Sequence, residues 1–440
     1  MLEFINKYIF GILVPCALMA AGLYFLIKLK FFPIRNFPQI IRALSKNGVN
    51  SMRALALSLA GTLGVGNIVG VASAIYSGGF GAIFWMWISA LVAAVLKYAE
   101  IVLAMRRRVP SENGFKGGAM YYIRSSLSGR FPKLGKVLSV VFALFCVLNC
   151  FSMGAVMQTN AISEAVSGAW NISGAVCGVV LAAITFFILC GGSKYIITLT
   201  SALVPFMSAL YILLSLAVII PRASLLPSVI KQIFSSAFTV ESAAGGIFGF
   251  LLSRALRFGV MRGLFSNEAG CGTSPTAHIS SESSPCEQGF MGIAEVFIDT
   301  VLLCSMTAFA VMLRYNEVGA FGSSPMKMVL EVYSGAFLPS FGGFVKGAMA
   351  FMVLCFGFAT ISCLSHYAFE CLEFLLRQKR GRWALIVFYC AAVFFGAVTD
   401  SAWAWAVSDF TVGTMTLINL AVLLFCRNEI SCETHKYFNF

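Results

Sequence analysis

Long apolar runs follow one another along almost the whole chain. A helix that spans a bilayer needs about 20 mostly apolar residues, and this 440-residue sequence offers such runs repeatedly, with a mean hydropathy of +0.88. Only 11% of its residues are charged, whereas soluble domains carry about 25%. A transmembrane β-barrel would instead show alternating segments of about ten residues, and none are visible. The sequence therefore predicts an all-α polytopic membrane protein.

Eleven spans are predicted, the first over residues 5–27. Glu3 and Lys7 precede this span and basic residues follow it, which is the reverse of a signal peptide, so we expect it to be retained. No long soluble domain fits between the spans. The other ten lie near 52–76, 82–105, 137–165, 172–190, 195–220, 242–281, 289–313, 344–375, 383–398 and 403–426.

The net charge of +13 has a distribution that indicates membrane orientation. Residues 28–53 hold six Lys or Arg and no acid, and residues 106–136 hold eight. With eleven spans, both stretches lie on the same side of the membrane, and the loops and tail on that side carry 21 of the 31 basic residues. Because basic loops stay in the cytoplasm, we expect the N-terminus outside and the C-terminus in the cytoplasm. The charge therefore reports topology, and no nucleic-acid partner is expected.

The fourteen cysteines carry little functional signal. Most lie inside predicted spans, no CxxC pair occurs, and histidines are almost absent nearby. A zinc site needs clustered Cys and His ligands, so we interpret these cysteines as small apolar packing residues.

Two spans contain sequences that should interrupt a helix. The stretch GTLGVGNIVG at 61–70 has four glycines, each of which costs a helix interior about 1 kcal/mol relative to alanine. The stretch GLFSNEAGCGTSPTAH at 263–278 adds Asn267, Glu268 and Pro275 to further glycines. In lipid, irregular backbone survives only where it is buried in protein or lines a cavity. Both breaks are therefore candidates for function, and Asn267 and Glu268 are candidates for coupling or gating.

The two breaks occupy matching positions. Without the first helix, ten spans remain as two sets of five, and each break lies in the first member of its set. Corresponding breaks in two halves indicate a binding site near the bilayer midplane. Because five is odd, the halves enter the membrane from opposite sides and form inverted repeats. The predicted segments are 1–50 (extra helix and linker), 51–221 (first repeat), 222–427 (second repeat) and 428–440 (tail).

Broken helices at mid-membrane suit a zwitterion beside a cation. Half-helix N-termini present free N–H groups and partial positive charge to a carboxylate, and freed carbonyls can bind Na⁺. Neutral side-chain oxygens for the cation come from Thr62, Asn67, Ser266 and Thr360. Two other interpretations apply to the first break. Gly66 and Gly70 form a small-xxx-small packing pattern, whereas a dinucleotide loop is excluded because no strand precedes it.

Few charged residues fall inside the predicted spans. Lys97 and Glu100 are three residues apart on one helix, which favours a structural ion pair or snorkelling over a proton relay. Glu295 and Asp299 share a helix face and should point into the bundle, which makes Asp299 a candidate for coupling or gating. His278 is better explained as a satisfied structural group than as a proton carrier.

At these residues the sequence resembles the alanine/glycine:cation symporters, also called sodium:alanine symporters. The resemblance runs through most of the chain, and FWMW together with SNEAG is very specific. The shared stretches are GTLGVGNIVGVASAI (61–75), GGFGAIFWMW (78–87), GGAMYYI (117–123), GGSK (191–194), LVPFM (203–207), RGLFSNEAGCGTSPTAH (262–278) and EVFIDT (295–300).

The resemblance implies a LeuT-like fold, with two inverted five-helix repeats plus an extra N-terminal helix, and site residues by position. The substrate carboxylate would meet the backbone near Gly64, and Phe265 would cover the substrate. The implied substrate-binding residues are Gly64, Val65, Gly66, Gln158, Phe265, Ser266 and Leu364. The implied Na⁺ ligands are Thr62, Leu63, Asn67 and Thr360.

Two local departures from the family pattern affect the expected substrate. Ala359 replaces a usual hydroxyl residue, and Leu364 stands where a pocket tryptophan is expected. A wider pocket would follow, so a small neutral amino acid is a better expectation than alanine alone.

The expected function is symport of alanine, glycine or a similar amino acid into the cell across a bacterial cytoplasmic membrane, driven by Na⁺ or alternatively H⁺. Serine, glutamine and D-amino acids stay open as substrates, and no protein partner is required. A channel would need a continuous polar pore, and an intramembrane enzyme would need a nucleophile–base pair or a metal cluster. With only three histidines in the chain, an enzyme is not expected. A transport-inactive sensor also stays open.

Overall fold

The computed structural model describes residues 6, 10–46, 49–111, 114–238, 253–315, 324–376, 381–400 and 402–438. Within these ranges the chain is almost entirely helical, and the only strands form the short antiparallel hairpin β1 (Val109–Ser111) and β2 (Gly114–Lys116). Up to this hairpin the helices are α2 (Gly11–Lys28), α3 (Phe32–Arg35), α4 (Phe37–Lys46), α5 (Val49–Thr62), η2 (Val65–Asn67), α6 (Val69–Gly78) and α7 (Gly81–Arg106).

Beyond the hairpin, α8 (Ala119–Leu127) leads into a long composite helix. Its parts are α9 (Pro132–Asn149), the π-helical η3 (Cys150–Met157) and α10 (Gln158–Trp170). The next helices are α11 (Gly174–Gly191), α12 (Ser193–Ile219), η4 (Ile220–Leu225), α13 (Leu226–Ala237), α16 (Arg254–Asn267) and α17 (Pro275–His278). The last are α18 (Pro285–Val296), η5 (Phe297–Cys304), α19 (Ser305–Leu313), α20 (Pro325–Ser334), α21 (Pro339–Leu376), α22 (Arg382–Val398), α23 (Ala402–Phe425) and α24 (Arg427–Phe438).

Eight helices of the described chain are long and apolar enough to cross a membrane, and a bent pair makes a ninth. The pair is α5 with η2 and α6, which meet at 60°. Helix α22 is also apolar but has 17 residues. The expected span 242–281 begins at residues that lie outside the described ranges. The predicted membrane class is confirmed, whereas the count of eleven spans is not.

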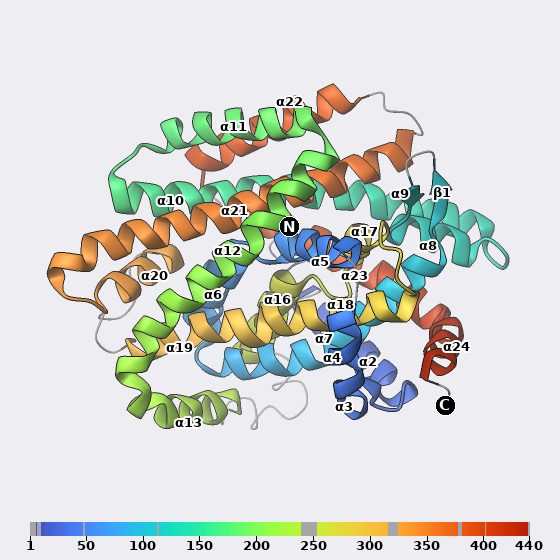
Figure 1. Cartoon of the computed structure of the whole chain (residues 1–440), viewed down its shortest axis with the longest axis horizontal. Coiled ribbons are helices and arrows are strands. Elements are labelled where there is room, and N and C mark those ends of the chain that lie inside the picture. The colour runs from blue at the N-terminus through green and yellow to red at the C-terminus, as the bar shows by residue number, and fades with distance from the viewer. Residues whose placement is uncertain are drawn as a thin grey trace.

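The helices pack as two groups (Figure 1). Helices α16 and α18 pack against α7, and α6 packs against α16. In the second group α10 packs against α21, and α11 packs against α22. Helix α12 crosses between the groups and contacts both α5 and α21. The division into repeats 51–221 and 222–427 stays a prediction.

Local backbone geometry explains both breaks. Helix α5 ends at Thr62. The backbone of Gly64 is extended, with φ −105° and ψ −163°, which interrupts the helix. One short turn, η2, follows before α6 begins. In the second break Glu268, Gly270 and Gly272 have positive φ values of 51°, 92° and 83°. Two of these are glycines, which adopt this conformation without steric cost. Pro275 then starts α17, where its missing N–H is not needed.

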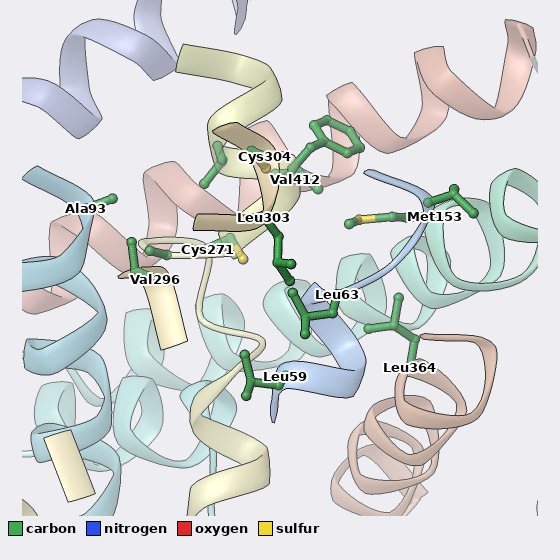
Figure 2. Close-up of a cluster of buried hydrophobic side chains, with 14 of the residues drawn as sticks. Leu59, Leu63, Ala93, Met153, Cys271, Val296, Leu303, Cys304, Leu364 and Val412 are labelled. Atoms are coloured by element: carbon green, nitrogen blue, oxygen red, sulfur yellow. The ribbon is translucent and has the colours of Figure 1, made fainter. Parts of the chain in front are cut away.

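Buried apolar side chains surround the first break. Figure 2 shows Leu59, Leu63, Leu303 and Leu364 gathered there. Large apolar side chains also cover the outer surface, including Phe187 and Phe344, which are 73% and 76% exposed. Soluble monomers rarely expose large apolar patches, so this surface suits contact with lipid.

Candidate functional site

The side chain of Gln158, on α10, connects the first break (residues 61–67) to the helix group that contains α10 and α21. The backbone N–H of Val65 donates to Gln158 Oε1 at 3.0 Å, and Gln158 Nε2 donates to the carbonyl of Met153 at 3.1 Å. A Cβ atom on Gly64 would lie 2.6 Å from Thr360 Oγ1 and 2.9 Å from Gln158 Oε1. Glycine is therefore required at position 64, because α10 and α21 approach the backbone so closely.

A small cavity lies at this break. The space open to the centre of a water-sized molecule is about 10 Å³, close to room for one water, so the cavity must widen to admit an amino acid. Five of the expected substrate-binding residues line it, and Ser266 and Leu364 do not. Its lining residues are Gly61, Thr62, Gly64, Val65, Gly66, Met153, Met157, Gln158, Phe265 and Trp405.

Leu364 lies behind the cavity wall. It is fully buried, and a Cβ atom on Gly154 would lie 2.7 Å from Leu364 Cβ, which shows how tightly α21 packs on η3 at this point. Leu364 therefore does not line the cavity in this conformation, and its expected effect on the width of the pocket stays a prediction. Met153, Met157 and Trp405 line the cavity instead. Sequence reasoning missed these three residues because an apolar side chain in an apolar span gives no signal of facing a cavity.

Asp299 is the centre of a buried polar cluster beside the cavity. Its Oδ1 accepts a hydrogen bond from Asn67 Nδ2 at 2.6 Å. Its Oδ2 accepts from Ser266 Oγ at 2.5 Å and from Thr300 Oγ1 at 2.8 Å. Among the residues that the structure describes, Asn67 Oδ1 is buried and has no hydrogen-bond partner. An orphaned buried acceptor costs about 1–3 kcal/mol, and hard cations bind such oxygens.

The side chains of the four expected cation ligands lie in four different surroundings. Asn67 belongs to the Asp299 cluster, whereas Thr62 donates to Glu295 Oε1 at 3.3 Å. Thr360 donates to the carbonyl of Ala60 at 3.0 Å, next to Gly64. Leu63 contributes a fully buried side chain to the apolar interior. The structure therefore does not bring the four residues together as one ligand set.

Lys97 forms a structural ion pair, one of the two alternatives expected for Lys97 and Glu100, but its partner is Glu295. Lys97 Nζ lies 2.9 Å from Glu295 Oε1 and donates to the carbonyl of Asn267 at 2.7 Å. Glu100 Oε1 instead accepts from the backbone N–H of Gly272 at 2.9 Å. Spacing along a helix permits the predicted pair, but neighbouring helices offer each side chain a better partner.

Asn267 and Glu268 hold the second break in shape. Asn267 Nδ2 donates to Thr300 Oγ1 at 3.0 Å, and Asn267 Oδ1 accepts from the N–H of Ala269 at 3.0 Å. Glu268 Oε2 accepts from Thr273 Oγ1 at 2.5 Å. Their expected roles in coupling or gating stay predictions.

Aromatic and charged side chains cover the cavity on one side. The rings of Phe265 and Trp405 lie 5.6 Å apart. The guanidinium of Arg262 lies 4.1 Å from the centroid of Trp405, and its Nη1 lies 3.8 Å from Asp409 Oδ1. These contacts join α16 to α23, so an amino acid entering from this side has to pass them.

Replacing Lys97 by methionine should strongly destabilise the protein. The change leaves Glu295 charged and buried, and breaking a buried ion pair costs about 3–5 kcal/mol. Lys116→Met is the matched control, because its pair with Glu373 is 36% and 29% exposed and exposed pairs contribute at most about 1 kcal/mol. Thermal unfolding of the purified proteins measures both. Equal losses in the two variants would contradict the importance of the buried pair.

Comparisons with known proteins identify the family and the fold. All 440 residues match the model of the sodium:alanine symporter family. The chain is 33% identical over 448 residues to the sodium/alanine symporter AgcS of Methanococcus maripaludis, with 99% of this chain and 96% of that protein covered. It is 33% identical over 435 residues to the amino-acid carrier protein AlsT of Bacillus subtilis, with 97% and 88% covered.

The fold resembles a crystal structure of MhsT in complex with L-phenylalanine. The TM-score is 0.61 at 13% sequence identity, and 86% of this chain and 89% of that chain are covered. Helices broken around a closed cavity, in this fold, define a membrane transporter of the LeuT type rather than an enzyme. The chain belongs to the sodium:alanine symporter family, whose members couple amino-acid transport to sodium or protons.

Proposed function

We propose that this protein imports a small neutral amino acid, alanine or glycine, together with Na⁺. One observation carries the proposal. At each break, one residue lines the cavity and the next residue contacts Asp299. Gly66 and Phe265 line the cavity, whereas Asn67 and Ser266 donate hydrogen bonds to the Asp299 carboxylate. Substrate and cation sites would therefore adjoin along both broken helices, so that occupation of one favours occupation of the other.

The cavity supports a substrate with a small side chain. The amides near Gly66 lie at the N-terminal end of η2 and α6, where partial positive charge favours a carboxylate. The opposite wall is apolar and carries the long side chains of Met153 and Met157. Little space remains for a larger side chain unless these residues move.

The cation would bind at the Asp299 cluster. Asp299 supplies negative charge, and Asn67 Oδ1 supplies a buried oxygen without a hydrogen-bond partner among the described residues. Thr360 with the carbonyl of Ala60 forms a second pair of oxygens on the other side of the break. Carbonyls of unwound helices commonly coordinate Na⁺ in transporters of this kind.

The energy available from Na⁺ is sufficient for accumulation. A membrane potential of 100 mV supplies about 2.3 kcal/mol per charge, and a tenfold Na⁺ gradient adds about 1.4 kcal/mol. One Na⁺ per substrate can therefore sustain a several-hundredfold amino-acid gradient, by alternating access and without covalent chemistry. On the orientation predicted from charge, the N-terminus lies outside and the C-terminus lies in the cytoplasm.

Uptake into proteoliposomes tests the proposal. An inward Na⁺ gradient should drive accumulation of labelled alanine or glycine, and replacing Na⁺ by choline should abolish it. Unlabelled serine, glutamine and D-alanine added as competitors would rank the alternative substrates. Accumulation driven equally well by a proton gradient without Na⁺ would contradict the assignment of the ion. Failure of all these amino acids to accumulate would contradict the transport function and favour a sensor.

A further inference from the structure

A second buried cluster, separate from Asp299, surrounds the carboxylate of Glu295. Oε1 lies 2.9 Å from Lys97 Nζ and accepts a hydrogen bond from Thr62 Oγ1 at 3.3 Å. Oε2 accepts from Ser58 Oγ at 2.8 Å and lies 3.5 Å from His278 Nε2. Oε2 also accepts a hydrogen bond from Ser274 Oγ at 3.4 Å, and Ser274 Oγ lies 2.7 Å from Ser58 Oγ. All six side chains of this cluster are buried.

The ring of His278 is held in a state that can accept a proton. Its Nδ1 lies 2.6 Å from Gln288 Nε2. With the Gln288 amide in this orientation its nitrogen donates to Nδ1, and a neutral ring then carries its hydrogen on Nε2, facing Glu295. Within the described chain, neither His278 Nε2 nor Gln288 Oε1 has a hydrogen-bond partner. Two buried polar atoms are therefore left unsatisfied around one imidazole.

One proton and one rotation would satisfy both atoms. If Nδ1 gains a proton, the Gln288 amide can turn by 180° so that Oε1 accepts from Nδ1–H. The imidazolium then carries a positive charge beside Glu295 Oε2, and a charge-assisted hydrogen bond is shorter and stronger than a neutral one. A carboxylate oxygen accepts about two hydrogen bonds, and Ser58 and Ser274 already donate to this one. A stronger bond from His278 would therefore weaken the bonds from these hydroxyl groups.

A cavity open to water comes close to this site, although His278 itself is buried and does not line it. Thr276, Ala277 and Ile279, the immediate neighbours of His278, line a cavity of about 1200 Å³. The same cavity is lined by Lys116 of the hairpin and by residues of α21, on the face that the charge distribution predicts to be cytoplasmic. A proton can therefore reach α17 from the cytoplasm without passing the substrate cavity.

The other ionisable groups near α17 come from the helices packed on it. Helix α5 contributes the hydroxyl groups of Ser58 and Thr62, since its one charged residue, Arg53, is exposed, and α18 contributes Glu295. Helix α7 contributes Lys97, and Arg108, between α7 and β1, donates to the carbonyl of Ile279 at 3.0 Å. Helix α21 contributes His366 and Glu370, which line the same cavity. Glu295 is the one carboxylate among these that lies within 4 Å of the His278 ring in the described structure.

We propose that His278 is a proton-binding site that controls release to the cytoplasm. Protonation draws Glu295 Oε2 toward His278 and weakens its bond to Ser58, one of the hydrogen bonds that hold α5 here beside those of Ser58 to Ser274 and of Thr62 to Oε1. The end of α5 then moves more easily. The step transfers one proton from cavity water to Nδ1 and returns it when α5 docks again. The inference rests on the proposed transport function, because movement of α5 matters only if a substrate is released past it.

Counterflow of labelled alanine tests this inference. Proteoliposomes would contain equal, saturating Na⁺ and equal pH on both sides, with pH varied from 5.5 to 8.5. We expect exchange by the unmodified protein to rise about fivefold or more as pH falls, the lower end of ordinary coupling between sites. His278→Gln should make the profile flat. His366→Gln is the matched control and should keep the dependence on pH.

The possible outcomes separate this inference from the proposed function. A flat profile for the unmodified protein, or an unchanged profile for His278→Gln, would overturn the role of His278 even if Na⁺-driven uptake is present. Absence of Na⁺-driven uptake would overturn the proposed function itself.

If His278→Gln is inactive, the Gln288→Glu variant tests the role of His278 instead. A carboxylate beside Nδ1 favours the imidazolium and should move the midpoint of the profile up by about one pH unit, and an unmoved midpoint would refute the site.

Discussion

Replacing Asp299 by asparagine is expected to lower Na⁺-driven alanine uptake by about a hundredfold or more. The carboxylate accepts hydrogen bonds from Asn67, Ser266 and Thr300, and hydrogen bonds to charged groups contribute about 1.5–3 kcal/mol each. Asparagine keeps the shape of the side chain but removes its charge and one acceptor oxygen. A loss of about 2.7 kcal/mol corresponds to a hundredfold change. Initial uptake rates at several Na⁺ concentrations measure the effect.

Asp400→Asn is the control for this variant. Asp400 is exposed and accepts only a local hydrogen bond, from the N–H of Ala402 at 2.8 Å, so uptake should stay within about twofold, as expected for a surface change. The Asp299 variant should also lose its dependence on Na⁺ if any activity survives. Normal uptake with unchanged Na⁺ dependence would show that the cation binds elsewhere.

Replacing Gly64 by alanine is expected to lower uptake by about tenfold or more, because the added methyl group has no space. Its Cβ would lie 2.6 Å from Thr360 Oγ1 and 2.9 Å from Gln158 Oε1. Either side chain must move, which separates Gln158 from the N–H of Val65 or Thr360 from the carbonyl of Ala60. Overpacking of this kind costs about 1–3 kcal/mol. We expect at least about a tenfold loss of uptake, measured at a protein level confirmed in the membrane.

Gly70→Ala separates two explanations for the glycines of the first break. A Cβ atom on Gly70 would meet no atom within 4 Å, and alanine is favoured over glycine within a helix by about 1 kcal/mol. We therefore expect unchanged uptake and equal or higher stability. If the glycines served mainly to pack α6 closely against a neighbour, Gly70→Ala would be damaging as well. A strong loss in this variant would favour that packing explanation.

The sequence predicts the backbone of the site better than its side-chain contacts. Glycines, proline and polar residues inside apolar runs mark where a membrane helix cannot continue, because lipid offers no partner for a free N–H or carbonyl. Gly64 accordingly lies at the cavity, as do Gln158 and Phe265, which the family resemblance implied. Helical periodicity does not hold through an unwound segment, so nothing in the sequence shows that Asn67 and Ser266 turn from the cavity toward Asp299.

Contacts with neighbouring helices explain why Lys97 and Leu364 differ from the sequence-based expectations. Lys97 can reach Glu100 along its own helix, but Glu295 on α18 takes it at 2.9 Å. Leu364 replaces an expected pocket residue, yet α21 packs so closely against Gly154 that the side chain at this position cannot reach the cavity in this conformation. Met153 and Met157 lie on the π-helical turn η3 or at its end. Their direction depends on that turn, which apolar periodicity does not reveal.

Equilibrium binding of labelled alanine to the purified protein, in NaCl and in choline chloride, tests the central claim most directly. If substrate and Na⁺ occupy adjoining sites on the same two broken helices, Na⁺ should raise the affinity for alanine by about tenfold or more, and alanine should raise the affinity for Na⁺ by the same factor. Asp299→Asn should remove this mutual effect. Equal alanine affinity in the two salts would contradict the account.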